Sequence, residues 1–125
     1  MTIQECQKKA HENALNKGFW EGSQNISEKL MLIVSELGEA CEALRDGNKT
    51  AFPAEFLELT EKDFDSKEPA DLFKVVIKNH MADELADVII RTCDLAEFMG
   101  YDLETHVRLK MRYNETRPRL HGKAF

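Results

Sequence analysis

The sequence contains no long apolar run, and this absence excludes a typical membrane-spanning helix. Hydrophobic residues make up 42% of its 125 residues and the mean hydropathy is −0.47, whereas a helix that crosses a bilayer needs about 20 mostly apolar residues in succession. Residues 1–17 are polar and lack the apolar region of a secretory signal peptide. We therefore expect a cytoplasmic protein with no membrane partner. Because a chain of this length suits one hydrophobic core, residues 1–125 are predicted to form a single domain.

The chain also has few cysteines, and its net charge is negative. Cys6, Cys41 and Cys93 are far apart and have apolar helical neighbours, which is typical of reduced, packed thiols. No Cys-x-x-Cys motif or Cys/His cluster indicates a zinc site. The net charge of −6 argues against nonspecific binding to nucleic acid, which requires a basic surface.

The positive charge that is present gathers near the C-terminus. There a single acid, Glu115, opposes a group of cations: Arg108, Lys110, Arg112, Arg117, Arg119 and Lys123. Two interpretations stay open for this stretch. Composition alone favours a solvated helix end whose cations complement the helix dipole. Alternatively, the basic stretch closes over a metal-bound polyphosphate.

Glycine and proline number only six and three, so the chain is divided into long helical segments. Capping residues or proline indicate four helix starts, at Thr2, Asn25, Pro69 and Asp102. Glycine or proline indicates the four ends, at Gly18, Gly47, Gly100 and Pro118. The third helix is predicted over about residues 70–99, with a break near residues 79–80.

The stretch from the end of the second helix to the predicted break in the third helix is long, covering residues 46–79. Within it we predict a short helix from about Pro53 and an acidic loop at residues 61–68. The chain has no internal repeat, and no run of alternating residues predicts a strand. We expect an all-α fold of the four-helix-bundle type with this elongated segment between helices two and three.

The second predicted helix carries two stripes of side chains. One is an apolar stripe at helical spacing, of Leu30, Ile33, Val34, Leu37, Cys41 and Leu44. The other lies on a different side of the helix and contains Leu32, Glu36, Glu39 and Ala43. Because a helix packed on only one face needs no second stripe, we infer that the two carboxylates face a cleft or a second interface.

Two pairs of carboxylates carry the strongest functional signal. Glu36 and Glu39 are three residues apart in one predicted helix, and Glu84 and Asp87 are three apart in the next, so each pair lies on one side of its helix. Acids placed against apolar residues are costly unless something positive is bound. Four such groups on two facing helices predict a site for a hard divalent cation, with Mg²⁺ preferred and Mn²⁺ as the alternative.

These acids also fit interpretations other than a metal site. Either motif alone is more often a solvated helix face. Carboxylate di-iron bundles use Glu-x-x-His motifs, which the central helices lack. In the last helix Lys110 and Asn114 share a face with Val107 and Met111, so they are predicted to point toward the packing side. Together these features favour a site that handles phosphates, because a divalent ion neutralises phosphate charge and activates water.

The residues that carry these motifs resemble the MazG-like superfamily of all-α nucleoside triphosphate pyrophosphohydrolases. The matching segments are SELGEACEAL, DELADVIIRTCDLAEFMGYDL and KMRYNETRP, within residues 25–44 and 81–118. That superfamily includes dCTP pyrophosphatases, dimeric dUTPases and phosphoribosyl-ATP pyrophosphohydrolases. Its signature is Glu-x-x-Glu on one helix and Glu-x-x-Asp on the next. Many members join these motifs by a shorter connection, so residues 46–79 put substrate choice and assembly in doubt.

The resemblance implies a function and a set of roles. The reaction would convert a nucleoside triphosphate, with a deoxynucleotide favoured, to its monophosphate and pyrophosphate. The four acids would bind Mg²⁺ and carry catalysis, and the substrate would be bound by Trp20, Asn25, Lys110, Asn114 and Arg117. Members of this superfamily assemble as homodimers or homotetramers.

Both the role of Trp20 and the function of the chain have alternative interpretations. A single Trp such as Trp20 is more often a partly buried anchor than a stacking platform for a base. The chain could also be a helical oligomer that binds nucleotide or protein without hydrolysis, or, less favoured, a phosphoribosyl-ATP pyrophosphohydrolase. No residue fixes the base and sugar, the number of metal ions, the general base or the oligomer size.

Overall fold

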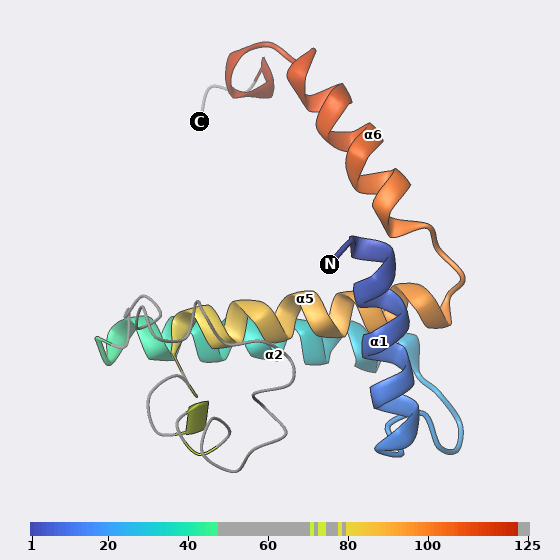
Figure 1. The fold of residues 1–125 in the computed structure, drawn as a ribbon. Helices are drawn as coiled ribbons and strands as arrows, with labels where there is room; N and C mark the ends of the chain where they lie inside the picture. The colour runs from blue at the N-terminus through green and yellow to red at the C-terminus, as the bar shows by residue number, and fades with distance from the viewer. Residues whose placement is uncertain (48–70, 72, 75–77, 79, 123–125) are drawn as a thin grey trace. The chain divides into compact units, whose positions relative to one another are not determined.

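A computed structural model describes residues 1–47, 71, 73, 74, 78 and 80–122 of the chain (Figure 1). Four α-helices have defined bounds, α1 (Ile3–Asn16), α2 (Ile26–Arg45), α5 (Met81–Phe98) and α6 (Leu103–Glu115), and a short 3₁₀ helix, η2, covers Arg119–Gly122. None of the described residues lies in a strand. The predicted all-α class with four main helices is confirmed. The predictions for Pro53 and residues 61–68 fall outside the described residues.

The predicted N-caps explain where three helices begin. In the capping box of α1, Glu5 donates its backbone N–H to Thr2 Oγ1 at 3.1 Å, and the Glu5 carboxylate accepts the Thr2 N–H at 2.7 Å. Asp102 accepts the Thr105 N–H at 2.9 Å at the start of α6, and Asn25 caps α2. These bonds satisfy backbone donors that have no partner within the helix. The predicted starts are confirmed at all three positions.

The ends of α1 and α5 share one geometry. Gly18 and Gly100 have φ of +79° and +69°, a region that side-chain-bearing residues rarely adopt. The residue after each glycine donates its N–H back to a helix carbonyl: Phe19 to Ala14 at 3.0 Å, and Tyr101 to Ala96 at 2.9 Å. This is the bonding pattern of a Schellman motif, and it explains why both helices stop at the predicted glycines.

The helix α5 begins at the predicted break, and residues 71, 73 and 74, which precede that break, are also helical. The His80 carbonyl accepts the N–H groups of Asp83 at 2.9 Å and Glu84 at 3.1 Å, which begins the helix at Met81. The first turn of α5 therefore carries two acids at its positive N-terminal end, an arrangement that the helix dipole favours. No helix among the described residues is long and apolar enough to cross a membrane.

The chain divides into two compact units, which we describe separately. The first unit contains Met1–Gln24 and Ile90–Phe125, and the second contains Asn25–Ile89. These are units of packing within the chain, and the single folding domain expected from the length stays a prediction.

In the first unit, the buried side chain of Gln7 joins α1 to the α5–α6 connection. Gln7 is 2% exposed. Its amide nitrogen donates to the Tyr101 carbonyl at 2.8 Å and to the Glu97 carboxylate at 3.3 Å, and its amide oxygen accepts the Leu103 N–H at 3.2 Å. A buried amide is tolerated only when it is hydrogen-bonded. These three bonds therefore fix α1 against the end of α5 and the start of α6.

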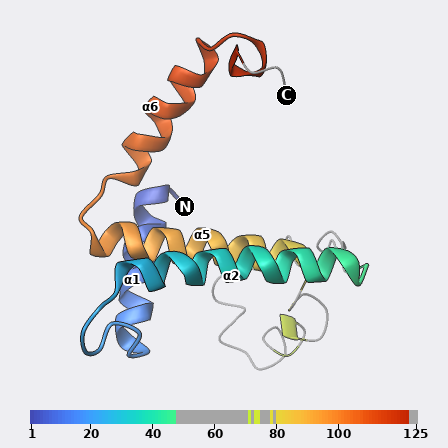
Figure 2. The same cartoon turned by 180° about the vertical axis from the view of Figure 1, so that it is seen from behind.

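In the second unit, α2 and the N-terminal part of α5 run side by side in opposite directions, as both ribbon views show (Figures 1 and 2). The buried residues of α2 are Glu36, Ala40 and Ala43, so part of the stripe that contains the acids is turned inward, while Leu32 and Glu39 of that stripe are exposed. The apolar stripe is instead open in the single chain, with Leu30, Val34, Leu37 and Leu44 exposed by 44–52%.

Candidate metal centre

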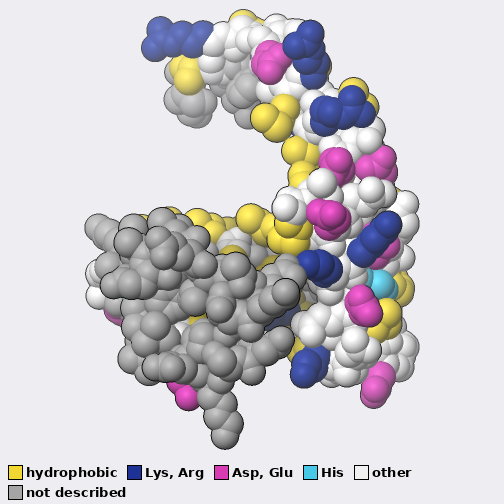
Figure 3. Space-filling view, viewed as in Figure 1, with side chains coloured by type: hydrophobic (Ala, Val, Ile, Leu, Met, Phe, Trp, Pro, Cys, Tyr) yellow, Lys and Arg dark blue, Asp and Glu magenta, His cyan; other side chains and the backbone are white. Residues whose placement is uncertain are grey.

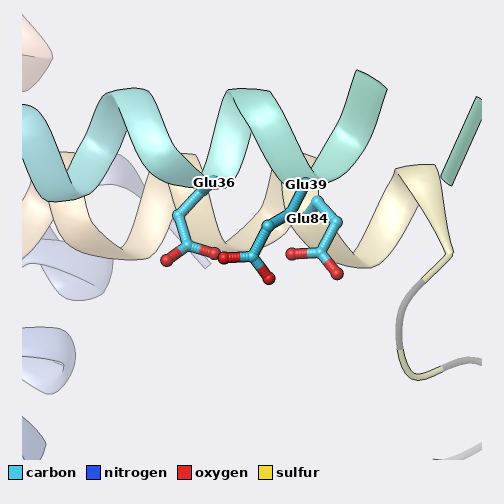
Figure 4. Close-up of side chains that lie close together, drawn as sticks. All are labelled: Glu36, Glu39 and Glu84. Atoms are coloured by element: carbon cyan, nitrogen blue, oxygen red, sulfur yellow. The ribbon is translucent and has the colours of Figure 1, made fainter. Parts of the chain in front are cut away.

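Three glutamates from two helices converge in the second unit. Glu36 and Glu39 extend from consecutive turns of α2, and Glu84 extends from the first turn of α5 (Figure 4). Each offers one carboxylate oxygen, and these atoms all lie within 4.8 Å of one another. The convergence that the sequence predicted for these three residues is therefore present in the fold.

The cluster is partly removed from water. Glu36 and Glu84 are each 5% exposed, whereas Glu39 is exposed. Burial raises the pKa of Glu84 above its usual value of 4.5, and the nearby carboxylates raise it further, Glu39 first and then Asp83, Glu36 and Asp87. A bound cation would reverse this effect, because it favours the charged form of each carboxylate.

The donor set fits a hard divalent ion. All three donors are carboxylate oxygens, which suit Mg²⁺ and Mn²⁺, and the cluster contains no His or Cys that would favour a softer metal. In an octahedral Mg²⁺ site with oxygens at about 2.1 Å, opposite ligands are about 4.2 Å apart. The three oxygens lie within 4.8 Å of one another, which is close to this separation. Small side-chain rotations of the long glutamates would bring the oxygens to coordination distance.

Asp87 lies close to this cluster without joining the group of three. It is half-buried, one turn after Glu84 on α5, and its charge contributes to the raised pKa of Glu84. Its predicted role as a metal ligand stays a prediction. Asp83 was not among the residues predicted from the sequence, although its charge also raises the pKa of Glu84. Its position directly before Glu84, in the same acidic first turn of α5, was the feature that could have indicated it.

Trp20 has a well-defined set of neighbours in the first unit. Its ring stacks on Phe98 with centroids 4.1 Å apart, and its indole N–H donates to Asp94 at 2.8 Å. The same Asp94 oxygen lies 2.7 Å from His11 Nδ1, and the His11 and Trp20 rings form a T-shaped pair with centroids 5.4 Å apart. These contacts make Trp20 an anchor between α1 and α5, which was the alternative reading of this residue. A contact with substrate stays a prediction.

Asn25 also has a structural role. Its side-chain oxygen accepts the N–H groups of Ser27 at 3.1 Å and Glu28 at 3.4 Å, and so caps α2. The cap fixes the start of the helix that carries Glu36 and Glu39. Asn25 therefore supports the cluster through α2, whatever it contacts in a nucleotide pocket.

The remaining predicted substrate residues lie in the first unit, on and just after α6. Lys110 and Asn114 are exposed, Arg117 is half-buried, and α6 has no buried residue. The face that was predicted to pack is thus open in the single chain. Lys and Arg side chains recur along α6 and η2 in the space-filling view (Figure 3). The structure describes this basic surface and the acidic cluster in separate units.

No protein-family model, curated protein sequence or solved structure matches this chain.

Proposed function

We propose that this protein is a Mg²⁺-dependent nucleoside triphosphate pyrophosphohydrolase of the MazG-like kind, acting on a nucleotide of the cytoplasmic pool. The observation that carries the proposal is the convergence of Glu36, Glu39 and Glu84 within 4.8 Å in a partly buried setting that raises the pKa of Glu84. Carboxylate clusters of this kind suit Mg²⁺ shared with substrate phosphates. The motifs of α2, α5 and α6 support the same reading through their resemblance to that superfamily.

The roles of the residues follow from their chemistry. Glu36, Glu39 and Glu84, with Asp87 beside them, would hold the ion, and Mn²⁺ would substitute for Mg²⁺. When bound, the ion would supply charge neutralisation at the phosphates and activation of water. One of the four carboxylates would accept the proton of the attacking water. Lys110, Asn114 and Arg117 would supply cationic and amide donors to phosphate oxygens, while Trp20 and Asn25 would border the nucleotide.

Pyrophosphate release from a panel of ribo- and deoxynucleoside triphosphates tests this function. With Mg²⁺ we expect release from at least one of them, and we expect EDTA to abolish it. Glu39→Ala is expected to lower the rate by about 100-fold or more, because loss of a supporting residue around a metal alone costs 10–100-fold. Glu42→Ala is the matched control, since Glu42 is an exposed acid of α2 outside the cluster and should leave the rate unchanged.

The same panel separates the proposal from its alternatives. Activity confined to phosphoribosyl-ATP would favour a housekeeping step on the same scaffold. If no triphosphate is cleaved while nucleotide still binds, the chain is a helical binding module. The presence of all four acids in the sequence argues against that module, because a protein that no longer hydrolyses nucleotide could lose them freely.

We further propose that the active form is a homodimer or homotetramer. Support comes from the apolar stripe of α2, in which Leu30, Val34, Leu37 and Leu44 stay 44–52% exposed. Such contiguous apolar surfaces mark interaction sites more often than free surface. The net charge of −6 argues against nucleic acid as the partner.

Sedimentation of the purified protein tests this assembly. We expect a species of two or four chains of 14.4 kDa. Leu37→Glu should shift it toward a single chain, because a charge would be buried without a partner. Ser35→Glu, on an exposed position of the same helix outside the stripe, should leave the assembly intact. A wild-type protein that sediments as one chain at micromolar concentration would exclude the assembly.

A further inference from the structure

Tyr113 lies between two cations at the C-terminal end of α6. Lys110 Nζ is 5.1 Å from the centroid of the Tyr113 ring, and Arg117 Cζ is 5.8 Å from the same centroid. Both distances fall within the range of about 6 Å in which a cation is attracted by an aromatic face. One ring therefore contacts a cation one turn before it and another just beyond the helix end.

The backbone after Tyr113 brings Arg117 to this position. Thr116 donates its N–H to the Tyr113 carbonyl at 3.1 Å and its hydroxyl to the same oxygen at 2.7 Å. Arg117 donates its N–H to the Asn114 carbonyl at 3.1 Å. These bonds continue the helical turn past the last residue of α6. The Arg117 side chain consequently returns to the face that carries Lys110, Tyr113 and Asn114.

The two cations differ from their neighbour Arg112 in their electrostatic environment. Arg112 pairs with Glu115 at 3.3 Å, whereas neither Lys110 nor Arg117 has a carboxylate partner among residues 80–122 and the other described positions. Two like charges on one face repel each other. Their attraction to a shared ring offsets part of this repulsion and limits where the two groups can move.

We propose that Tyr113 is a positioning residue that holds Lys110 and Arg117 at a fixed spacing, so that this face of α6 binds a polyphosphate anion. The inference rests on the proposed function in taking the triphosphate of the substrate as that anion. A chain of phosphates carries several oxyanions along its length, and so it can meet two separated cations at once. The amide of Asn114, on the same face, adds a neutral donor.

Calorimetric titration with inorganic tripolyphosphate, in EDTA and at low ionic strength, tests this role without requiring hydrolysis. Tyr113→Leu is expected to weaken binding about three- to tenfold, as loss of cation–π contacts at an exposed site would. Tyr113→Phe keeps the ring and should bind within about twofold of wild type. Tyr101→Leu is the matched control, because Tyr101 and Tyr113 are both 55% exposed, and it should bind as wild type does.

Hydrolysis kinetics provide a second readout that a merely structural residue would not move. In an active protein Tyr113→Leu should raise KM for the triphosphate by a similar factor and change kcat much less, with Tyr113→Phe restoring KM. The inference is overturned if wild type does not bind tripolyphosphate, if Tyr113→Leu binds it as tightly as wild type, or if Tyr113→Phe is as weak as Tyr113→Leu. Binding that depends on Tyr113 in a protein that cleaves no triphosphate would overturn the proposed function instead.

Discussion

Glu84→Gln is expected to abolish pyrophosphate release and, in the same protein, to raise the unfolding temperature measured without divalent ions. The loss of activity should be about 100-fold or more, since the variant removes a charged ligand from the cluster. The gain in stability has a separate cause. Burial and four neighbouring carboxylates, those of Glu36, Glu39, Asp83 and Asp87, raise the pKa of Glu84, so its charged form is unfavourable in the folded protein.

The stability advantage of Glu84→Gln is expected to increase with pH. A raised pKa means that the folded protein holds the proton of Glu84 more tightly than the unfolded chain does. The tightly held proton of Glu84 therefore stabilises the folded protein fully below pH 4.5, the usual pKa of the group. This stabilisation is lost as the pH rises through the raised pKa of the folded state. Glutamine does not ionise. The stability advantage of Glu84→Gln should be about 0.5–2 kcal/mol at pH 7 and should vanish near pH 4.

Thermal denaturation followed by circular dichroism, together with the pyrophosphate assay, measures both effects. Glu42→Gln is the control, because Glu42 is an exposed acid of the same unit outside the cluster, and it should change neither quantity. A Glu84→Gln protein that keeps its activity would remove Glu84 from the site. One that is less stable than wild type at pH 7 would contradict the account of its buried charge.

Divalent cations are expected to stabilise the wild-type protein strongly. A ligand that binds only the folded state adds about 2.7 kcal/mol at a concentration 100 times its dissociation constant. For Mg²⁺ this would exceed the effect of most single substitutions. The stabilisation should weaken as the pH falls through the raised pKa of Glu84, because protons compete with the ion for the carboxylates.

Unfolding curves with and without MgCl₂ at pH 5 and pH 7 measure this effect, with NaCl of equal ionic strength as the control. Glu36→Gln should remove most of the stabilisation by Mg²⁺ while leaving the response to NaCl unchanged. Equal stabilisation by the two salts would show that the cluster responds to screening rather than to a bound ion.

The parts of this fold that the sequence predicted are local in origin. The starts at Thr2, Asn25 and Asp102 are set by capping side chains within the first turn, and the ends at Gly18 and Gly100 by a backbone conformation that glycine adopts at low cost. Such signals depend on neighbours a few residues away, so they can be found without knowledge of the fold.

Which side of α2 packs against α5 could not be predicted with the same certainty. Its two stripes are both spaced for a helical face, and spacing alone does not say which one meets α5. The structure buries Glu36, Ala40 and Ala43 and leaves the leucine stripe exposed. The same limit applies to Asp87: its spacing from Glu84 is favourable, but the carboxylates that lie within 4.8 Å are those of the three glutamates.

Contacts between residues far apart in the chain could not be predicted from the sequence either. Nothing near Trp20 indicates that its ring stacks on Phe98 or that its N–H bonds to Asp94, which lie some 75 residues further along. Gln7 looks like an ordinary surface residue of an amphipathic helix, yet it is 2% exposed and forms three hydrogen bonds to the α5–α6 region. The roles of Trp20 and Gln7 are set by tertiary packing and not by residue type alone.

Titration of the protein with Mn²⁺, followed by the loss of the free-ion signal in electron paramagnetic resonance, measures occupancy of the glutamate cluster directly. Saturable binding at micromolar to millimolar Mn²⁺, displaced by Mg²⁺ and weakened at least tenfold in Glu84→Gln but not in Glu42→Gln, is the predicted result. Wild-type protein that takes up no Mn²⁺ at neutral pH, or whose uptake is the same in both variants, would mean that these three side chains do not form a metal site.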